Sequence, residues 1–166
     1  QLVERAFAEG ADNVFTTSPK LVGASLRAAV KHPQVRILNC SMEMPYASIR
    51  TYYTRVYEAK FITGAIAGAM AQGDRIGYVA DYPSFGVPAN INAFALGARM
   101  VNPRVKVELF WTCLPDQEDP LTVFNRKNIT VVSGRDAPVP GRPQREFGTF
   151  LIRPGGILQD LATPFW

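Results

Sequence analysis

The sequence contains few of the residues and motifs that carry catalysis or bind metals. It has two cysteines without CxxC spacing and one histidine, His32, so the common cysteine and histidine zinc sites are excluded. The motifs of a nucleophile elbow, a dinucleotide fold, a phosphate loop and an HExxH zinc enzyme are absent. Cys40 would need a base, and His32 is expected at the far end of the helix-to-strand connection that precedes it. We therefore predict no enzymatic activity, no cofactor and no metal site.

Long apolar runs and dense charge are also absent. No apolar stretch reaches the ~18 residues that a membrane-spanning helix needs. The net charge is +4, and its carriers are scattered apart from four arginines near the C-terminus, at positions 135, 142, 145 and 153. A nucleic-acid surface would need a denser basic stripe with interleaved aromatic residues, so these charges are interpreted as a solvated face and no nucleic-acid partner is predicted.

The composition is that of a globular α/β protein. Of the 166 residues, 47% are apolar and 19% are charged, which suits one domain or two small lobes. Helical and strand-like segments alternate, as in a parallel sheet. Predicted helices cover residues 1–9, 21–32, 56–71, 89–101 and 119–128, and predicted strands cover 12–16, 35–40, 48–55, 75–80, 105–111 and 129–134. The chain is expected to end in a β-hairpin around 154–156.

Local signals mark several element ends. Gly10 is expected to stop the first helix, Ser18 to cap the second ahead of Pro19, and Asp119 to cap the helix that Pro120 begins. His32 lies at a helix C-terminus, where it can interact with the helix dipole.

Small residues and cysteines indicate packing. Gly64, Ala65, Gly68 and Ala69 form a narrow helix ridge that lets a neighbouring strand or helix approach closely. The two cysteines, at 40 and 113, each end an apolar strand-like run, so buried and unreactive thiols are expected.

Ligands of parallel α/β sheets bind at the carboxyl ends of the strands. The loops that follow the predicted strands cover residues 16–18, 40–42, 81–87, 112–114 and 134–137. They combine hydroxyls and aspartates with Tyr82 and Phe85, a mixture that can hold a small polar ring compound. The alternative is that both aromatic residues pack the loop and that Asp81 caps a turn; the residues alone leave both open.

Five segments carry a resemblance to a known family. They are VFTTS at 14–18, AVKHPQVRILNCS at 29–41, YYTRVYEAKFITGAIAG at 52–68, IGYVADYP at 76–83 and INAFALGARMVNP at 91–103. With them, most of the chain resembles the basic membrane protein family of substrate-binding lipoproteins, the purine-nucleoside-binding relatives of type 1 periplasmic binding proteins.

The resemblance implies a two-lobed protein that closes on a ligand and delivers it to the permease subunits of a membrane importer. It implies a partial first lobe at 1–55, a second lobe at 56–166, three-layer parallel sheets without the family's first βα unit, and an extracytoplasmic, lipid-anchored location. Together with the positions after the strands, it gives the expected ligand-binding residues as Ser18, Ser41, Asp81, Phe85, Asn90 and Asp136.

Two positions depart from the family pattern. The nucleoside binders have an acidic residue where Ser41 stands and an aromatic residue near Asn90, so the ligand is predicted only as nucleoside-like or otherwise polar. Two alternatives remain: a ligand-sensing domain of a larger protein, and an enzyme of the nucleoside or sugar class that uses Asp81 or Asp136.

Overall fold

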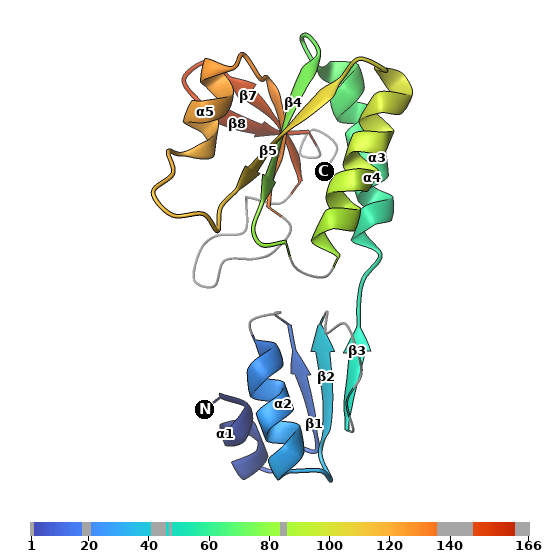
Figure 1. Ribbon diagram of the computed structural model, residues 1–166, viewed down its shortest axis with the longest axis vertical. Coiled ribbons are helices and arrows are strands. Elements are labelled where there is room, and N and C mark those ends of the chain that lie inside the picture. Colours follow the sequence, from blue (N-terminus) through green and yellow to red (C-terminus); the bar gives the residue numbers. More distant parts are fainter. Residues whose placement is uncertain are drawn as a thin grey trace. The chain divides into compact units, whose positions relative to one another are not determined.

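The computed structural model describes residues 2–17, 21–40, 46, 48–83, 86–135 and 148–161. The chain divides into two compact units, Gln1–Thr54 and Arg55–Trp166, and each is described by itself (Figure 1). The assignment of 1–55 and 56–166 to the two lobes of a binding protein stays a prediction.

The first unit contains a three-stranded parallel sheet in the order β1-β2-β3. Its elements are α1 (Leu2–Ala8), β1 (Asn13–Thr16), α2 (Val22–Lys31), β2 (Arg36–Cys40) and β3 (Ile49–Tyr52). Gly10 ends α1 as expected: it adopts φ 89°, and the N–H of Ala11 donates to the carbonyl of Ala6 at 3.0 Å. Strand β3 is four residues long, half of the predicted 48–55 segment.

The helices that the structure describes in the first unit pack on one face of this sheet. Val3 of α1 and Ala28 of α2 form a buried cluster with Ile37 and Ile49 of the strands. Phe15, whose side chain points to the opposite face, is exposed. This part of the unit therefore has two layers, where three were predicted.

Two local predictions in the first unit need correction. Helix α2 begins at Val22 with Leu21 as its N-cap, without a side-chain cap bond, and Ser18 lies outside the described residues. Cys40 is half-buried rather than buried, as is Cys113 in the second unit, and the described residues contain no disulfide between them. Cys40 is the last residue of β2 and Cys113 lies in a turn after a strand, positions that fewer neighbouring side chains cover.

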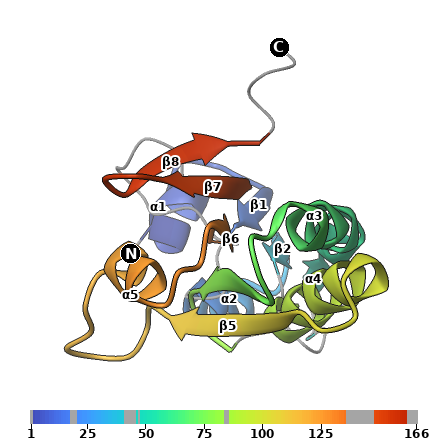
Figure 2. The same cartoon turned by 90° about the horizontal axis from the view of Figure 1, so that it is seen from above.

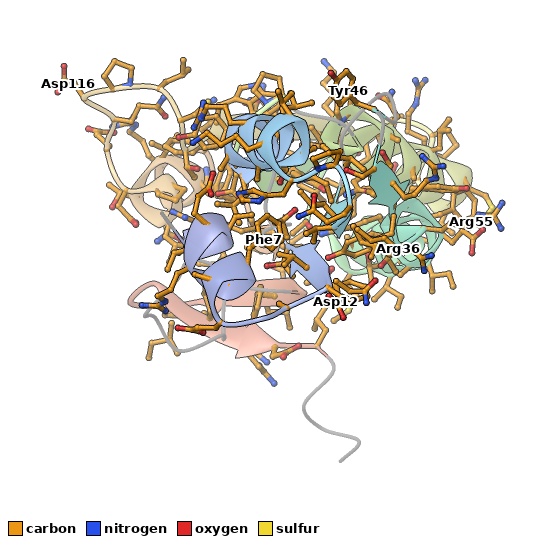
Figure 3. The ribbon with its side chains drawn as sticks, turned by 90° about the horizontal axis from the view of Figure 1, so that it is seen from below. Phe7, Asp12, Arg36, Tyr46, Arg55 and Asp116 are labelled. Carbon is orange, nitrogen blue, oxygen red and sulfur yellow. The ribbon has the colours of Figure 1, made fainter. Side chains whose placement is uncertain are left out.

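His32 is the C-cap residue of α2, which agrees with its predicted place at a helix end. It also does more: its Nε2 lies 2.9 Å from Oε2 of Glu4, and its ring centroid lies 5.1 Å from that of Phe7, which is labelled in Figure 3. The bond to His32 lowers the pKa of the Glu4 carboxyl. These contacts hold α1 against α2.

The second unit contains a five-stranded sheet in the order β5-β4-β6-β7-β8. Strands β5, β4 and β6 are parallel, and β7 and β8 form the predicted C-terminal hairpin. Its elements are α3 (Val56–Met70), β4 (Arg75–Ala80), α4 (Val87–Val101), β5 (Lys106–Trp111), α5 (Pro120–Arg126), β6 (Val131–Ser133), β7 (Thr149–Arg153) and β8 (Ile157–Asp160). Asp119 caps α5 as predicted, accepting a bond from the N–H of Thr122 at 3.1 Å.

Alternate side chains of the central strand β4 fill two separate cores. Ile76, Tyr78 and Ala80 point toward α3 and α4, where they meet Phe94. Val79 points to the other face and packs with a cluster that includes Phe124 of α5 and Phe150 of β7. The second unit therefore has three layers, helices α3 and α4, the sheet and α5, as Figures 1 and 2 show.

The predicted glycine ridge of α3 is a helix–helix contact. A Cβ added at Gly64 would collide with the carbonyl oxygen of Phe94, and one at Gly68 with that of Ala98. The contact is mutual, since a Cβ on Gly97 of α4 would collide with the carbonyl of Phe61. Ala69, which was predicted in the ridge, is exposed instead. The two backbones touch without intervening side chains, which fixes α3 beside α4.

Candidate functional site

Polar side chains gather at the carboxyl ends of the parallel strands in the second unit. Asp81 follows β4, Thr112 follows β5, and Ser133 ends β6 two residues before Arg135. Since these strands are parallel neighbours, their carboxyl ends meet at one edge of the sheet. We call the five residues that gather there the polar edge: Lys60, Asp81, Thr112, Ser133 and Arg135.

Asp81 joins three strands at the polar edge. The hydroxyl of Thr112 donates to its Oδ1 at 3.0 Å, and Nη1 of Arg135 lies 3.4 Å from the same oxygen. The side chains of Asp81 and Arg135 are 13% and 26% exposed, so water screens this ion pair less than a surface pair. The arrangement presents a fixed carboxylate and a fixed guanidinium at the place where ligands of parallel sheets bind.

Lys60 brings a second cation to the polar edge from α3. Its side chain is only 8% exposed, because the aliphatic stem crosses the core. The ammonium donates to Oγ of Ser133 at 2.8 Å and lies 5.0 Å from the ring centroid of Tyr78. Phe94 packs edge-on against that tyrosine, with ring centroids 5.3 Å apart. Lys60 is therefore held by the core and presents its charge at the end of β6.

A second polar group supports the carboxyl ends of β1 and β2 in the first unit. The Asn39 amide donates to Oγ1 of Thr16 at 2.6 Å and to Oγ of Ser25 at 3.2 Å, and all three side chains are buried. The hydroxyl of Ser25 donates in turn to the carbonyl of Leu21 at 2.9 Å. The phenol of Tyr52 donates to the carbonyl of Thr16 at 3.3 Å, and burial raises the pKa of that phenol. These bonds fix the strand ends from which residues 17 and 41 continue.

The structure describes two of the six predicted ligand-binding residues. Asp81 belongs to the polar edge, where its carboxylate contacts Thr112 and Arg135. The sequence alone left open whether Asp81 caps a turn or contacts a ligand. Asn90 lies in the first turn of α4 and is 4% exposed, so a ligand reaches its side chain only by entering below the surface. Ser18, Ser41, Phe85 and Asp136 lie outside the described residues, and the binding roles of all six stay predictions.

Sequence reasoning missed Lys60 and Ser133. It placed Thr112 and Arg135 in loops at the ligand-binding strand ends without naming either as a site residue. The sequence could have pointed to Lys60, because it is the single charged residue between positions 59 and 70. Arg135 was counted among the solvated arginines. Its pairing with Asp81 depends on two strand ends that lie 54 residues apart, from position 81 to position 135, and no local pattern reveals it.

Other features of the described residues do not add a second site. No group of three histidine, cysteine or acidic side chains within this part of the chain could hold a metal ion. A hollow of about 370 Å³ lies between α1 and the end of α2, lined by Glu4, Phe7, Asp12 and His32 among others. Asp12 precedes β1 (Figure 3), so this hollow is at the amino ends of the strands, away from the predicted ligand-binding edge. None of the described helices has both the length and the apolar character to cross a membrane.

Two solved structures share the fold. One is an ABC transporter solute-binding protein from Conexibacter woesei, with a TM-score of 0.52 over 81% of this chain and 47% of that protein. The other is a transcriptional activator of the comK gene from Bacillus halodurans, with a TM-score of 0.56 over 76% of this chain and 44% of that protein. Both are 18% identical to this chain, so the likeness concerns the fold alone.

Two curated relatives are closer in sequence. A purine-binding protein of Brucella abortus is 30% identical over 109 residues, which cover 66% of this chain and 31% of the relative. A protein of Haloferax volcanii, named as a candidate ABC transporter glucose-binding protein, is 36% identical over 85 residues, which cover 51% of this chain and 21% of the relative. The chain thus spans less than a third of the length of these relatives.

The longest of the sequence matches is to a protein family. Residues 2–113 match the family described as ABC transporter substrate-binding protein, PnrA-like. The matched range contains the first unit and, in the second, the helix pair, β4, β5 and the Asp81–Thr112 part of the polar edge. The chain belongs to the Bmp family, the PnrA-like substrate-binding proteins of ABC transporters.

Proposed function

We propose that this chain binds a small polar ligand at the carboxyl ends of its parallel strands and serves an ABC-type uptake system without catalysing a reaction. The observation that carries the proposal is the polar edge, where Asp81, Thr112 and Arg135 converge from three strands in a family of substrate-binding proteins. Such convergent polar groups fix the orientation of a ligand.

The chemistry of the polar edge favours a ligand that both donates and accepts hydrogen bonds. Asp81 supplies an acceptor, whereas Lys60 and Arg135 supply donors. Nucleosides, bases and sugars have such mixed edges, and the two curated relatives are named for purine and for glucose. Since Ser41 and Asn90 depart from the nucleoside-binding pattern, we propose the class of polar ring compounds and no single member of it.

Membership of an ABC substrate-binding family supports the remaining parts of the proposal. The ligand would be handed to permease subunits outside the cytoplasm, with the chain held at the membrane through a lipid anchor. The loop residues Ser18, Ser41, Phe85 and Asp136 would complete the ligand contacts.

Calorimetric titration of the full-length protein with a panel of nucleosides, bases and sugars tests the proposal. We expect one class to bind, and we expect Asp81→Asn to weaken that binding at least tenfold, because the carboxylate loses its charge and its hold on Arg135. Asp74→Asn is the matched control, since Asp74 pairs with Arg104 at 3.6 Å near the amino end of β4. Absence of binding across the panel, or equal loss in both variants, would contradict the proposal.

A ligand-sensing role in a larger protein is the second candidate. The observation that favours it is the fold shared with a transcriptional activator. Sequencing the complete gene separates the two: an upstream lipoprotein signal supports uptake, and an attached DNA-binding segment supports sensing.

A further inference from the structure

Thr149 carries a buried hydroxyl beside the polar edge. It is the first residue of β7 and is 5% exposed. Its Oγ1 is enclosed and has no hydrogen-bond partner among the described residues. The backbone at this position is fixed, because its carbonyl accepts a bond from the N–H of Leu161 at 3.0 Å. A buried hydroxyl without a partner is costly and uncommon in native proteins, so the group that pairs with this one has to be identified.

The pairing of the strands places this hydroxyl next to Ser133. Strand β6 lies between β4 and β7 (Figure 2), and Thr149 stands directly opposite Ser133 in the antiparallel pair. Directly opposite residues share a face of the sheet, with Cβ atoms about 4.5–5.5 Å apart. It is the face that α3 and α4 cover, because Val131 and Leu151, each two residues further along its strand, pack in the core with Tyr78. The unpaired hydroxyl therefore lies at the strand ends where ligands of parallel sheets bind.

Lys60 determines which chemical group fits beside Thr149. Its ammonium donates to Oγ of Ser133 at 2.8 Å, and the hydroxyl of Ser133 donates in turn to the carbonyl of Gly134 at 3.3 Å. Ser133 is thus engaged as acceptor and as donor, whereas the hydroxyl of Thr149 can still take either role. A group that lies close to an ammonium is favoured when it accepts hydrogen bonds. The matching group is an acceptor oxygen of a hydroxyl or a carbonyl.

We propose that Thr149 is a ligand-binding residue whose hydroxyl bonds to a hydroxyl or carbonyl oxygen of the polar ring compound. The inference rests on the proposed function and adds to it a residue of β7, outside the segment 2–113 that matches the family. As at Asn90, the ligand reaches this side chain only by entering below the surface. The bond fixes one oxygen of the ring compound against β7, while Asp81 and Arg135 contact other groups of the same ligand.

Thr149→Val tests the proposal, because valine keeps the shape of threonine and removes the hydroxyl. The full-length protein is titrated calorimetrically with the panel of nucleosides, bases and sugars, in which guanosine, guanine and glucose are oxygen-bearing members of the three classes. Thr149→Val is expected to raise the dissociation constant of the best binder about fivefold or more, since its oxygen is left without a partner in a buried place. Thr149→Ser restores the hydroxyl and is expected to bind within about twofold of the wild type.

Thr130→Val is the matched control. Oγ1 of Thr130 is also buried without a partner among the described residues, but Thr130 immediately precedes β6, at the opposite end of that strand from Ser133. This variant is expected to bind the ligand as the wild type does. Urea denaturation of the second unit without ligand gives an independent readout. Both valine variants should be at least as stable as the wild type, because neither loses a hydrogen bond.

Three results would overturn the inference and leave the proposed function intact. The first is that Thr149→Val binds as tightly as the wild type while Asp81→Asn does not. The second is that Thr149→Val lowers the stability of the second unit, which would show that the hydroxyl is already bonded within the protein. The third is equal weakening by valine and serine at position 149, which would assign the loss to shape. Absence of binding across the panel would overturn the inference together with the proposed function.

Discussion

The glycine contact between α3 and α4 allows a quantitative prediction for Gly97→Ala. Its new Cβ would overlap the carbonyl oxygen of Phe61 and lie 3.0 Å from the backbone nitrogen of Ala65, so the clash is with backbone that cannot rotate away. Relief requires the helices to move apart along their shared length. Overpacking of this kind costs about 1–3 kcal/mol or more. Alanine regains about 0.5–1 kcal/mol from its better helix propensity, which leaves a net loss of about 1–2 kcal/mol in the free energy of unfolding.

Gly23→Ala in α2 is the matched control. The nearest atom to its added Cβ is Nη1 of Arg27 at 3.6 Å, the mobile end of a long side chain. The same substitution should therefore stabilise the first unit by about 0.5–1 kcal/mol. Urea denaturation followed by circular dichroism measures both variants, with a separate transition allowed for each unit. If Gly97→Ala were as stable as the wild type, or if both variants changed stability in the same direction, the close backbone contact would be refuted.

Two further predictions concern buried and paired polar groups. Asn39→Ala leaves Thr16 and Ser25 without the amide that donates to both hydroxyls in the core. Urea denaturation of the first unit is expected to show a loss of about 1–3 kcal/mol in the free energy of unfolding. A loss below about 0.5 kcal/mol would contradict the hydrogen-bond network. Hydrogen bonding to Lys127 lowers the pKa of Glu108, so this carboxylate contributes stability above its unfolded pKa that is lost as the pH falls through the folded value. Lys127→Met should raise that pKa in an NMR titration, and an unchanged value would show that the 2.7 Å pair does not form in solution.

The sequence predicted the parts of the fold that local physics determines. Gly10 and Asp119 end and begin helices through bonds to residues a few positions away, so their sequence signals were sufficient. The continuous burial of β4 from Ile76 to Ala80 follows from a strand covered on both sides, which its apolar run indicated. The prediction that Ser18 caps α2 was wrong, since the helix begins at Val22 with Leu21 as its N-cap; a Ser-Pro pair is a common but not an obligatory helix start.

The candidate site could be predicted only in part. That Asp81 would lie at a strand end followed from the order of strands and loops. The bond between Lys60 and Ser133 joins residues 73 positions apart, and it depends on how α3 lies across the sheet. The glycine ridge was recognised, but its partner Gly97 was not, because a helix contact depends on the faces of both helices.

Hydrogen exchange of the full-length protein, with and without the polar compound that binds best, tests the central claim most directly. If the polar edge binds the ligand, the amides that follow β4, β5 and β6, at residues 81–82, 112–114 and 134–135, should exchange more slowly in its presence. Those near the amino ends of the same strands, at 73–74 and 104–105, should be unaffected. Protection confined to other segments, or no protection by any bound compound, would contradict the account.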